Sequence, residues 1–491
     1  MTKAASRRMG LELCGRRLAL ALPALLSACV AGPDYREPPV AVPAAFSQTS
    51  PEGQPDAAWW QGFGDPLLDR LISEARAANL DVRQAALRVE EARHQTRIVG
   101  AAPSPSVSAD AQVSHTRLSE NAVVGPLPGG AGTPGAPGTA FDTYQLGFDA
   151  SWELDLFGAN RRAVEAAQAR TGAAVWSLRD AEIILTAEVA RAYLDYRALD
   201  QRIAINNQLG EVRSEALAFH QVRRRHGLTT TLDERSAERD IASAAAARQD
   251  LIARRAARAH ALAVLLGRPP LALVAELAAT SPPQGAPDVI PVGLPSELLK
   301  RRPDVRAAER NLAAATADIG VAAADLYPSI SLTGAVSLVS GSLSRLISTD
   351  SIQPTAGAGL VLPILDGGRR RATLGLRRTQ AQEALLAYQA VVLVALKDVE
   401  DALTRLEADR ARQSQLQSAE AAARDQLATV QTQKNAGLAT GLDLLAARAS
   451  LLDATDALAQ ARAATDQDGV ALYKALGGGW DERSVADSGE A

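Results

Sequence analysis

Residues 143–156 read TYQLGFDASWELDL, a stretch in which polar and apolar side chains alternate without a break. Strict alternation of this length is typical of a β-strand with two different faces. It also matches a strand that crosses a lipid bilayer, which takes about ten residues and has lipid on one side and water on the other. A soluble sheet with one solvated face has the same period. We favour the membrane strand because the apolar face carries three aromatic residues, as in an interfacial girdle: Tyr144, Phe148 and Trp152.

This strand belongs to one copy of an internal repeat. Asp81-Val82-Arg83 recurs 223 positions later as Asp304-Val305-Arg306, whereas Gly227-Leu228 recurs 210 positions later as Gly437-Leu438. The first copy therefore carries 13 extra residues between these motifs, and the glycine- and proline-rich run 125–138 accounts for them as a loop. The mature chain is predicted to consist of two copies of one structural unit.

Each copy is expected to hold two strands and a pair of long helices. Between Gly158 and about His226, and between Gly368 and about Asn435, the sequence contains no proline and almost no glycine. One continuous helix of that length would be on the order of 100 Å long. The second long helix has two neighbouring apolar seams, which suit a helix flanked on both sides, as in a cylinder of helices. An ordinary antiparallel bundle remains the alternative.

Composition and the repeat together divide the chain into six segments. The predicted strands cover about 105–117 and 141–156 in the first copy, and about 329–339 and 352–364 in the second. The segments are a signal peptide at 1–28, an extended lipidated segment at 29–63, the first repeat at 64–267, a proline-rich linker at 268–295, the second repeat at 296–477 and a flexible C-terminal tail at 478–491.

Four strands are too few to close a barrel by themselves. Open strand edges in lipid would leave backbone groups without hydrogen bonds, which is costly. Strands that span a membrane must therefore be pooled between chains. Two chains would supply eight strands, and the interior of such a barrel is filled by side chains, so a duct requires three or more chains.

The N-terminus has the pattern of a bacterial lipoprotein signal. Four arginines precede the apolar run Leu18–Leu26, and the sequence Leu26-Ser27-Ala28-Cys29 then resembles a lipobox. We expect cleavage before Cys29 and an N-acyl diglyceride on this cysteine. Val30 follows it where an aspartate would favour retention in the inner membrane, so export to the outer membrane is expected.

Composition argues against several other classes of protein. The formal net charge is −4, without the basic excess of a nucleic-acid binder. The five histidines are scattered, and we find no phosphate-binding loop, nucleophile elbow or metal-ligand spacing. The chain is therefore expected to be neither an enzyme nor a metal or nucleic-acid binder, with the lipid on Cys29 as its sole prosthetic group.

Three stretches resemble a known family. They are CVAGPDYREPPVAVP at 29–43, WWQGFGDP at 59–66 and LPSELLKRRPDVRAAERNL at 294–312. They resemble the TolC-like outer-membrane factors, specifically the outer-membrane efflux lipoproteins (NodT type) of resistance–nodulation–division (RND) pumps. The resemblance implies an α+β membrane protein with four transmembrane strands per chain and long coiled helices. It also implies a homotrimer whose twelve-stranded β-barrel continues as a periplasmic α-helical barrel.

The resemblance also implies partners and roles for individual residues. The chain would contact outer-membrane lipid, a periplasmic adaptor and an inner-membrane RND-type transporter. Leu442 and Asp443 resemble the periplasmic gate, although Ala446 stands where family members often carry a second acid. The alternative for Asp443 is an ordinary acid at a helix N-terminus. The tips that would meet the adaptor are Gly227, Leu228 and Thr229 in the first copy, and Gly437, Leu438 and Thr440 in the second.

The sequence thus predicts a passive channel for drugs or other small molecules, located in the outer membrane of a Gram-negative bacterium. Its periplasmic end would be closed at rest and opened by the adaptor and transporter. Two alternatives remain at this point. One is the outer-membrane duct of an ABC-type exporter, and the other is a structural periplasmic lipoprotein without a pore.

Overall fold

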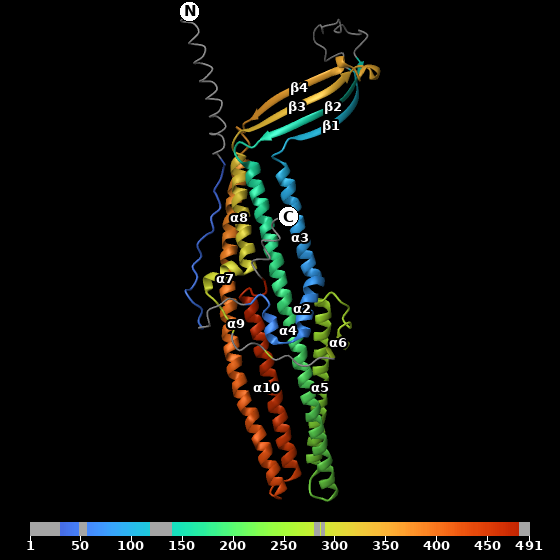
Figure 1. Ribbon diagram of the computed structural model, residues 1–491, viewed down its shortest axis with the longest axis vertical. Coiled ribbons are helices and arrows are strands. Elements are labelled where there is room, and N and C mark those ends of the chain that lie inside the picture. Colours follow the sequence, from blue (N-terminus) through green and yellow to red (C-terminus); the bar gives the residue numbers. More distant parts are fainter. Residues whose placement is uncertain (1–29, 49–55, 118–139, 279–284, 286–289, 481–491) are drawn as a thin grey trace, which may run out of the picture. The chain divides into compact units, whose positions relative to one another are not determined.

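The computed structural model describes residues 30–48, 56–117, 140–278, 285 and 290–480 (Figure 1). Cys29 lies outside these ranges, so the predicted lipidation site is not among the described residues. None of the helices in the described ranges is both long enough and apolar enough to cross a membrane.

The chain forms two compact units, and each unit takes separate stretches from both repeats. We call them the strand unit and the helix unit. The strand unit runs up to Glu37 and includes Glu91–Thr171 and Arg310–Leu385. The helix unit consists of Pro38–Glu90, Gly172–Glu309 and Leu386 onward.

The strand unit contains a four-stranded antiparallel sheet with the order β1-β2-β3-β4. Its strands are β1 (Ser106–Arg117), β2 (Ala140–Leu154), β3 (Ser329–Ser340) and β4 (Ile352–Val361), with the short helices η2 (Leu343–Arg345) and η3 (Thr349–Ser351) between the last two. The pairing of β2 with β3 joins the two repeats in one sheet. Strands β1 and β4 lie at its two edges.

The register places the apolar residues of neighbouring strands on the same face of the sheet. Phe148 lies opposite Ala109 on β1 and Val336 on β3, and Val336 in turn lies opposite Pro354 on β4. Because side chains alternate along a strand, Asp149 and its polar neighbours occupy the other face. Phe148 is 64% exposed, so the apolar face is open in the single chain. The predicted two-faced strands are confirmed.

The long helices have equal lengths in the two repeats. Helices α4 (Ala159–Arg225) and α9 (Arg369–Asn435) have 67 residues each, and α5 (Thr231–Leu265) and α10 (Gly441–Ala475) have 35 each. The shorter α3 (Leu80–Ala101) and α8 (Pro303–Ala324) both have 22 residues. The repeat read from sequence motifs is therefore also a repeat of structure.

The helix unit is held together around the start of α2 (Pro66–Ala78). The Asp65 side chain caps this helix by accepting a hydrogen bond from the backbone N–H of Leu67 at 2.9 Å. The second Asp65 oxygen accepts the hydroxyl proton of Tyr193 on α4, and Arg197 Nε donates to that hydroxyl at 3.0 Å. Leu68 is fully buried beside this network. These hydrogen bonds between Asp65, Tyr193 and Arg197 thus connect α2 to α4.

Several connecting segments have more structure than the sequence indicated. The N-terminal segment contains η1 (Trp59–Phe63), and the predicted linker contains α6 (Val274–Ala278) and leads into α7 (Pro295–Arg301). Trp480, which was assigned to the flexible tail, is buried, and its indole N–H donates to the Arg301 carbonyl at 3.1 Å. A tryptophan buries a large apolar surface once its single donor is satisfied. Trp480 therefore packs on the helix unit, and the rest of the predicted tail, 481–491, lies outside the described residues.

Candidate functional site

Two tight turns connect the long helices in pairs and contain the predicted tip residues. Gly227 (φ 69°) and Gly437 (φ 74°) adopt the left-handed conformation that a residue with a Cβ rarely takes. The next backbone N–H groups, those of Leu228 and Leu438, donate back to the last turn of the helix at 2.9 and 2.8 Å. This hydrogen-bond pattern is the Schellman motif, which ends a helix abruptly.

The two leucines at these turns are open to solvent. Leu228 is 65% exposed and Leu438 is 80% exposed, although the residue at this position of a Schellman turn often packs against its own helix. Thr229 is half-buried with its hydroxyl bound to Asp233, and Thr440 is exposed. Each helix pair therefore ends in one exposed apolar side chain next to a glycine.

Asp443 caps the N-terminus of α10. Its carboxylate accepts hydrogen bonds from the Thr440 hydroxyl and from the Thr440 backbone N–H, both at 2.7 Å, and the Thr440 hydroxyl accepts from the Asp443 N–H at 3.2 Å. These bonds lower the pKa of the Asp443 carboxyl, which is fully exposed. Leu442, the other predicted gate residue, is half-buried, and Ala446 is exposed. The geometry realises the alternative in which Asp443 is a capping acid, and leaves its carboxylate charged and accessible to water.

The first repeat has the same capping box, which the sequence analysis did not single out. Asp233 accepts hydrogen bonds from the backbone N–H and the hydroxyl of Thr230 at 3.2 and 3.1 Å. Together with the Thr229 hydroxyl these bonds lower the pKa of Asp233. The signal was available, because Asp233 stands 210 positions before Asp443, the spacing that separates the two turns.

The two turns do not have the same side-chain packing. Helix α10 begins with Gly441, and a Cβ at this position would lie only 2.8 Å from the Phe219 ring of α4. In the other repeat, Thr231 corresponds to Gly441 and Thr429 corresponds to Phe219. The contact between a glycine and an aromatic ring is therefore not duplicated. The structure thus brings the second turn, with its predicted gate residues, against the first helix pair.

The predicted aromatic girdle lies along β2 in the strand unit. Phe148 and Trp152 are exposed, whereas Tyr144 is half-buried. The Trp152 indole N–H donates to the Pro103 carbonyl at 2.8 Å, close to the end of the sheet that adjoins the helices. Two further aromatic residues, which the alternation pattern did not predict, form a stacked pair at this end.

The stacked pair consists of Phe157, between β2 and α4, and Tyr327, between α8 and β3. Their rings stack at a centroid distance of 4.6 Å and an angle of 12°. Aromatic side chains with a polar edge are enriched where a membrane meets water. With Trp152 they mark the level at which strands change into helices.

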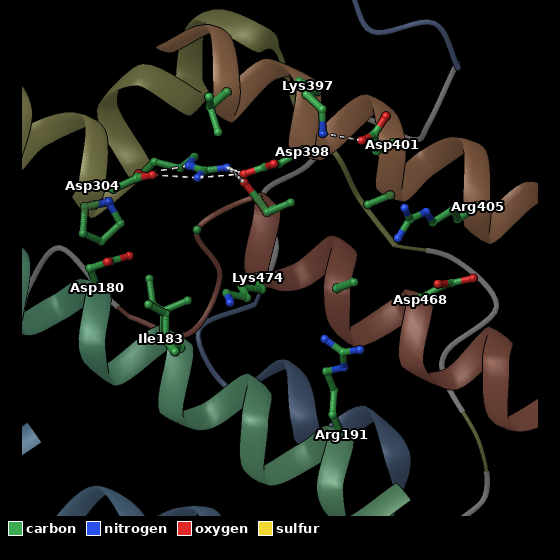
Figure 2. Close-up of a pocket in the computed structure, with 18 residues that line it drawn as sticks. Asp180, Ile183, Arg191, Asp304, Lys397, Asp398, Asp401, Arg405, Asp468 and Lys474 are labelled. Atoms are coloured by element: carbon green, nitrogen blue, oxygen red, sulfur yellow. Dashed lines mark hydrogen bonds and ion pairs between the residues drawn. The ribbon is translucent and has the colours of Figure 1, made fainter. Parts of the chain in front are cut away.

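A charged cavity of about 530 Å³ lies within the helix unit, between α4, the start of α8, α9 and α10 (Figure 2). Arg302 is its centre: the guanidinium binds Asp304 at 2.6 Å and Asp398 at 3.2 Å, and donates to the Ala475 carbonyl at 3.2 Å. On the rim, Lys397 and Asp401 form an ion pair at 2.6 Å. The motif Arg301-Arg302-Pro303-Asp304, which carries part of the family resemblance, therefore joins α8 to α9 and α10.

Two acids at this cavity have unusual protonation. Burial, reinforced by a hydrogen bond to Asp409, raises the pKa of the Asp468 carboxyl to about 6. Burial and the nearby Asp304 raise the pKa of Asp180. The lining contains five aspartates and five basic residues, so its formal charges balance, and no nucleophile lies beside a base among these residues. No sequence pattern predicted this cavity.

The chain matches the family model described as outer membrane efflux protein over residues 71–268 and 294–478, which correspond to the two repeats. Nodulation protein T of Rhizobium leguminosarum bv. viciae is 32% identical over 97% of this chain and 96% of its own length. Outer membrane protein OprJ of Pseudomonas aeruginosa is 33% identical over 94% and 96% of the two chains.

Solved channels have the same fold. The outer-membrane channel OprN superposes with a TM-score of 0.82 at 33% identity, covering 92% of this chain and all of the other. CusC, a transmembrane channel, gives a TM-score of 0.76 at 28% identity with coverage of 92% and 100%. The matched proteins are efflux channels of the Gram-negative outer membrane and not enzymes. This chain belongs to the outer membrane efflux protein family.

Proposed function

We propose that the protein is the outer-membrane channel of a tripartite efflux pump and acts as a homotrimer. The observation that carries this proposal is the sheet, in which β1 and β4 are edge strands and one face is apolar and open. Free strand edges are costly in lipid because no water satisfies their backbone groups. Three chains that pair β4 of one with β1 of the next would close a twelve-stranded barrel, and the helices would continue it as a tunnel.

The partners in this proposal are a periplasmic adaptor and an inner-membrane transporter of the RND type. The exposed Leu228 and Leu438, supported by the glycine turns beside them, offer apolar contact points for the adaptor at the ends of the helix pairs. Relatives are named for different cargoes: CusC of Escherichia coli is a cation efflux system protein, and OpmQ of Pseudomonas putida is a pyoverdine export outer membrane protein. A passive duct would suit either ions or drugs, because the transporter selects what enters it.

The entrance of the channel would lie at the second turn. In a trimer three copies of Asp443 would form a ring of carboxylates, and Leu442 would narrow the passage beside it. A ring of like charges favours cations and repels anions at low salt. The entrance is closed at rest and opens when the adaptor draws the α9–α10 pair away from the first pair, with Gly437 as the pivot. Cys29 anchors each chain to the membrane through its acyl groups.

Ion conductance of the purified, lipidated protein in planar bilayers tests the proposal. Small, steady and cation-preferring openings from a particle with the mass of three chains are expected. A monomer that shows no conductance, both as the wild type and as the Asp443→Ala variant, would instead favour the structural lipoprotein without a pore. In that case protease would also cleave Tyr144–Leu156 in membranes, whereas a membrane strand is protected. An ABC-type exporter duct would conduct as well, and co-purification of an ABC rather than an RND transporter would identify it.

A further inference from the structure

The first described residues of the chain lie on a site in the strand unit that is shaped for them. The backbone N–H of Ala31 donates to the Phe157 carbonyl at 2.9 Å, in the connection between β2 and α4. On α4, Arg162 Nε donates to the Ala31 carbonyl at 3.3 Å, and another nitrogen of the same guanidinium binds Asp34 at 2.6 Å. Arg162 itself is only 5% exposed, so its charge is held between these partners and Glu165.

Two glycines make this contact possible. Gly32 has φ 88°, and a Cβ on it would lie 2.4 Å from the Gly320 Cα of helix α8. A Cβ on Gly320 would in turn lie 2.9 Å from the Ala31 carbonyl oxygen and 2.7 Å from the Arg162 side chain. Glycine inside a helix is unfavourable relative to alanine, so its presence in α8 needs a local reason. The close approach of the N-terminal segment supplies that reason.

The internal repeat provides a comparison within the same chain. Gly320 stands 223 positions after Arg97, and Arg162 stands 210 positions before Ala372, which are the two spacings of the repeat. In the other copy, Arg97 places a large side chain at the position of Gly320, where the N-terminal segment approaches closely. Ala372 places only a methyl group at the position of Arg162. The chain has a single N-terminus, and this receptor occurs at only one of its two equivalent junctions.

We infer that Phe157, Arg162 and Gly320 form a receptor for residues 30–34 that sets the depth of the lipid anchor. The inference rests on the proposed lipidation of Cys29. Consecutive Cα atoms are about 3.8 Å apart, so a fixed Val30 places the acylated residue next to the change from strand to helix. Val30 itself contacts Gly158, where a Cβ would lie 2.8 Å from its side chain. The stacked Phe157 and Tyr327 rings lie at the same junction, as expected for a membrane–water boundary.

The consequence for the molecule is that the acyl chains enter the bilayer beside the ends of β2 and β3 instead of anywhere that a free tether could reach. An unattached segment of five to ten residues would let the lipid move over roughly 10–20 Å relative to the sheet. Fixed at the junction, the lipid enters the bilayer at a defined depth relative to the sheet, at the end where the strands meet the helices.

Photocrosslinking from the lipid itself tests the inference. The full-length protein is expressed in a Gram-negative host fed a fatty acid with a diazirine group, irradiated in outer membranes, and analysed by mass spectrometry. In the wild type we expect crosslinks concentrated at residues 154–159 and 324–329. Gly320→Ala, which blocks the notch but favours helix α8, should reduce them roughly tenfold and disperse the rest, because it opens a local contact. Gly100→Ala is the matched control, since a Cβ on that helical glycine would meet no atom within 4 Å outside its own helix backbone.

An acylated wild type without crosslinks at the junction, or an unchanged map in Gly320→Ala, would overturn the inference while lipidation stands. Absence of label on Cys29 would reject lipidation and the inference together. Asp34→Asn gives a second test that does not threaten folding, because the Asp34 side chain is 85% exposed. Amide hydrogen exchange at Ala31 should accelerate in this variant and remain unchanged in Gly100→Ala. Equal exchange in all three proteins would show that Arg162 does not hold the segment.

Discussion

At the scale of single residues, Asp443 combines two roles that one experiment can separate. It caps α10, and it supplies the charge of the proposed entrance ring. Its hydrogen bonds lower the pKa of the carboxyl, so the charge is present throughout the neutral and mildly acidic range. Its structural role is shared with Asp233, which caps α5 in the same way. In the proposed channel, the charge of the entrance ring is assigned to Asp443 and not to Asp233.

Asp443→Ala should therefore raise the conductance and weaken the cation preference of the channel, whereas Asp233→Ala should leave both unchanged. Both variants lose a capping box and should be destabilised to a similar extent. The measurement is single-channel current with reversal potentials in a salt gradient, at low ionic strength where charge effects are largest. Identical currents in the two variants would remove Asp443 from the entrance.

Asp468 provides a prediction about pH at the same scale. Its pKa is about 6 in the folded protein, above the value of 3.8 for the free side chain. The protonated form is thus stabilised by folding, and this contribution is complete below pH 4 and is lost as the pH rises through 6. The shift corresponds to about 3 kcal/mol at most, and partial exposure reduces it to about 1–2 kcal/mol.

Asp468→Asn keeps a hydrogen-bonding group beside Asp409 but cannot ionise. We expect the variant to be more stable than the wild type at pH 7.5 and equal to it at pH 4, as measured by thermal unfolding across this range. Asp401→Asn is the control with the opposite sign. Its ion pair with Lys397 lowers the pKa of Asp401, so its loss should destabilise the protein at neutral pH. A constant difference between Asp468→Asn and wild type would contradict the shifted pKa.

At the scale of elements, helices and strands could be predicted closely because they depend on local pattern. Alternation defined β2, and the absence of proline together with the glycine stops defined α4 and α9. The charged cavity could not be predicted, because Asp180, Asp398 and Asp468 come from three different helices and Arg302 from the connection between α7 and α8. Which of these charges meet depends on helix packing, about which periodicity says nothing. Asp233 is an intermediate case. Its capping role could be predicted from the sequence, because it stands 210 positions before Asp443, at the spacing of the repeat.

The two faces of β2 give a prediction at this scale. Phe148 lies near the middle of the strand on the apolar face, and Gln145 lies on the polar face. Arginine on a lipid-facing strand position costs about 2–4 kcal/mol near the middle of the bilayer. Phe148→Arg should therefore abolish assembly of the trimer in the outer membrane, while Gln145→Arg is tolerated. Membrane fractionation followed by native electrophoresis measures both, and equal loss in the two variants would contradict a lipid-facing apolar side.

At the scale of the whole molecule, the repeat supplies two similar helix pairs, and departures from the repeat mark where one pair acts differently from the other. Arg162 and Gly320 mark the junction that receives the N-terminus. Phe219 and Gly441 mark the end where the α9–α10 pair contacts the α4–α5 pair. A duct built only from identical pairs would have no preferred pair to move. In the proposed opening, the break in symmetry at Gly441 points to the contact with Phe219 as the one that separates.

Gly441→Ala places a Cβ 2.8 Å from the Phe219 ring, closer than carbon atoms approach in practice, so either the ring, whose residue is 40% exposed, or the second helix pair must shift. We expect a higher open probability in bilayers and increased uptake of a large antibiotic by cells that carry the variant. Phe219→Ala combined with Gly441→Ala removes the ring and should restore the closed state at least in part. Gly210→Ala controls for the methyl group itself, because a Cβ on this helical glycine would meet no atom within 4 Å outside its own helix backbone. If Gly441→Ala stays closed, the contact is packing that persists in both states, and opening must occur elsewhere along α9 and α10.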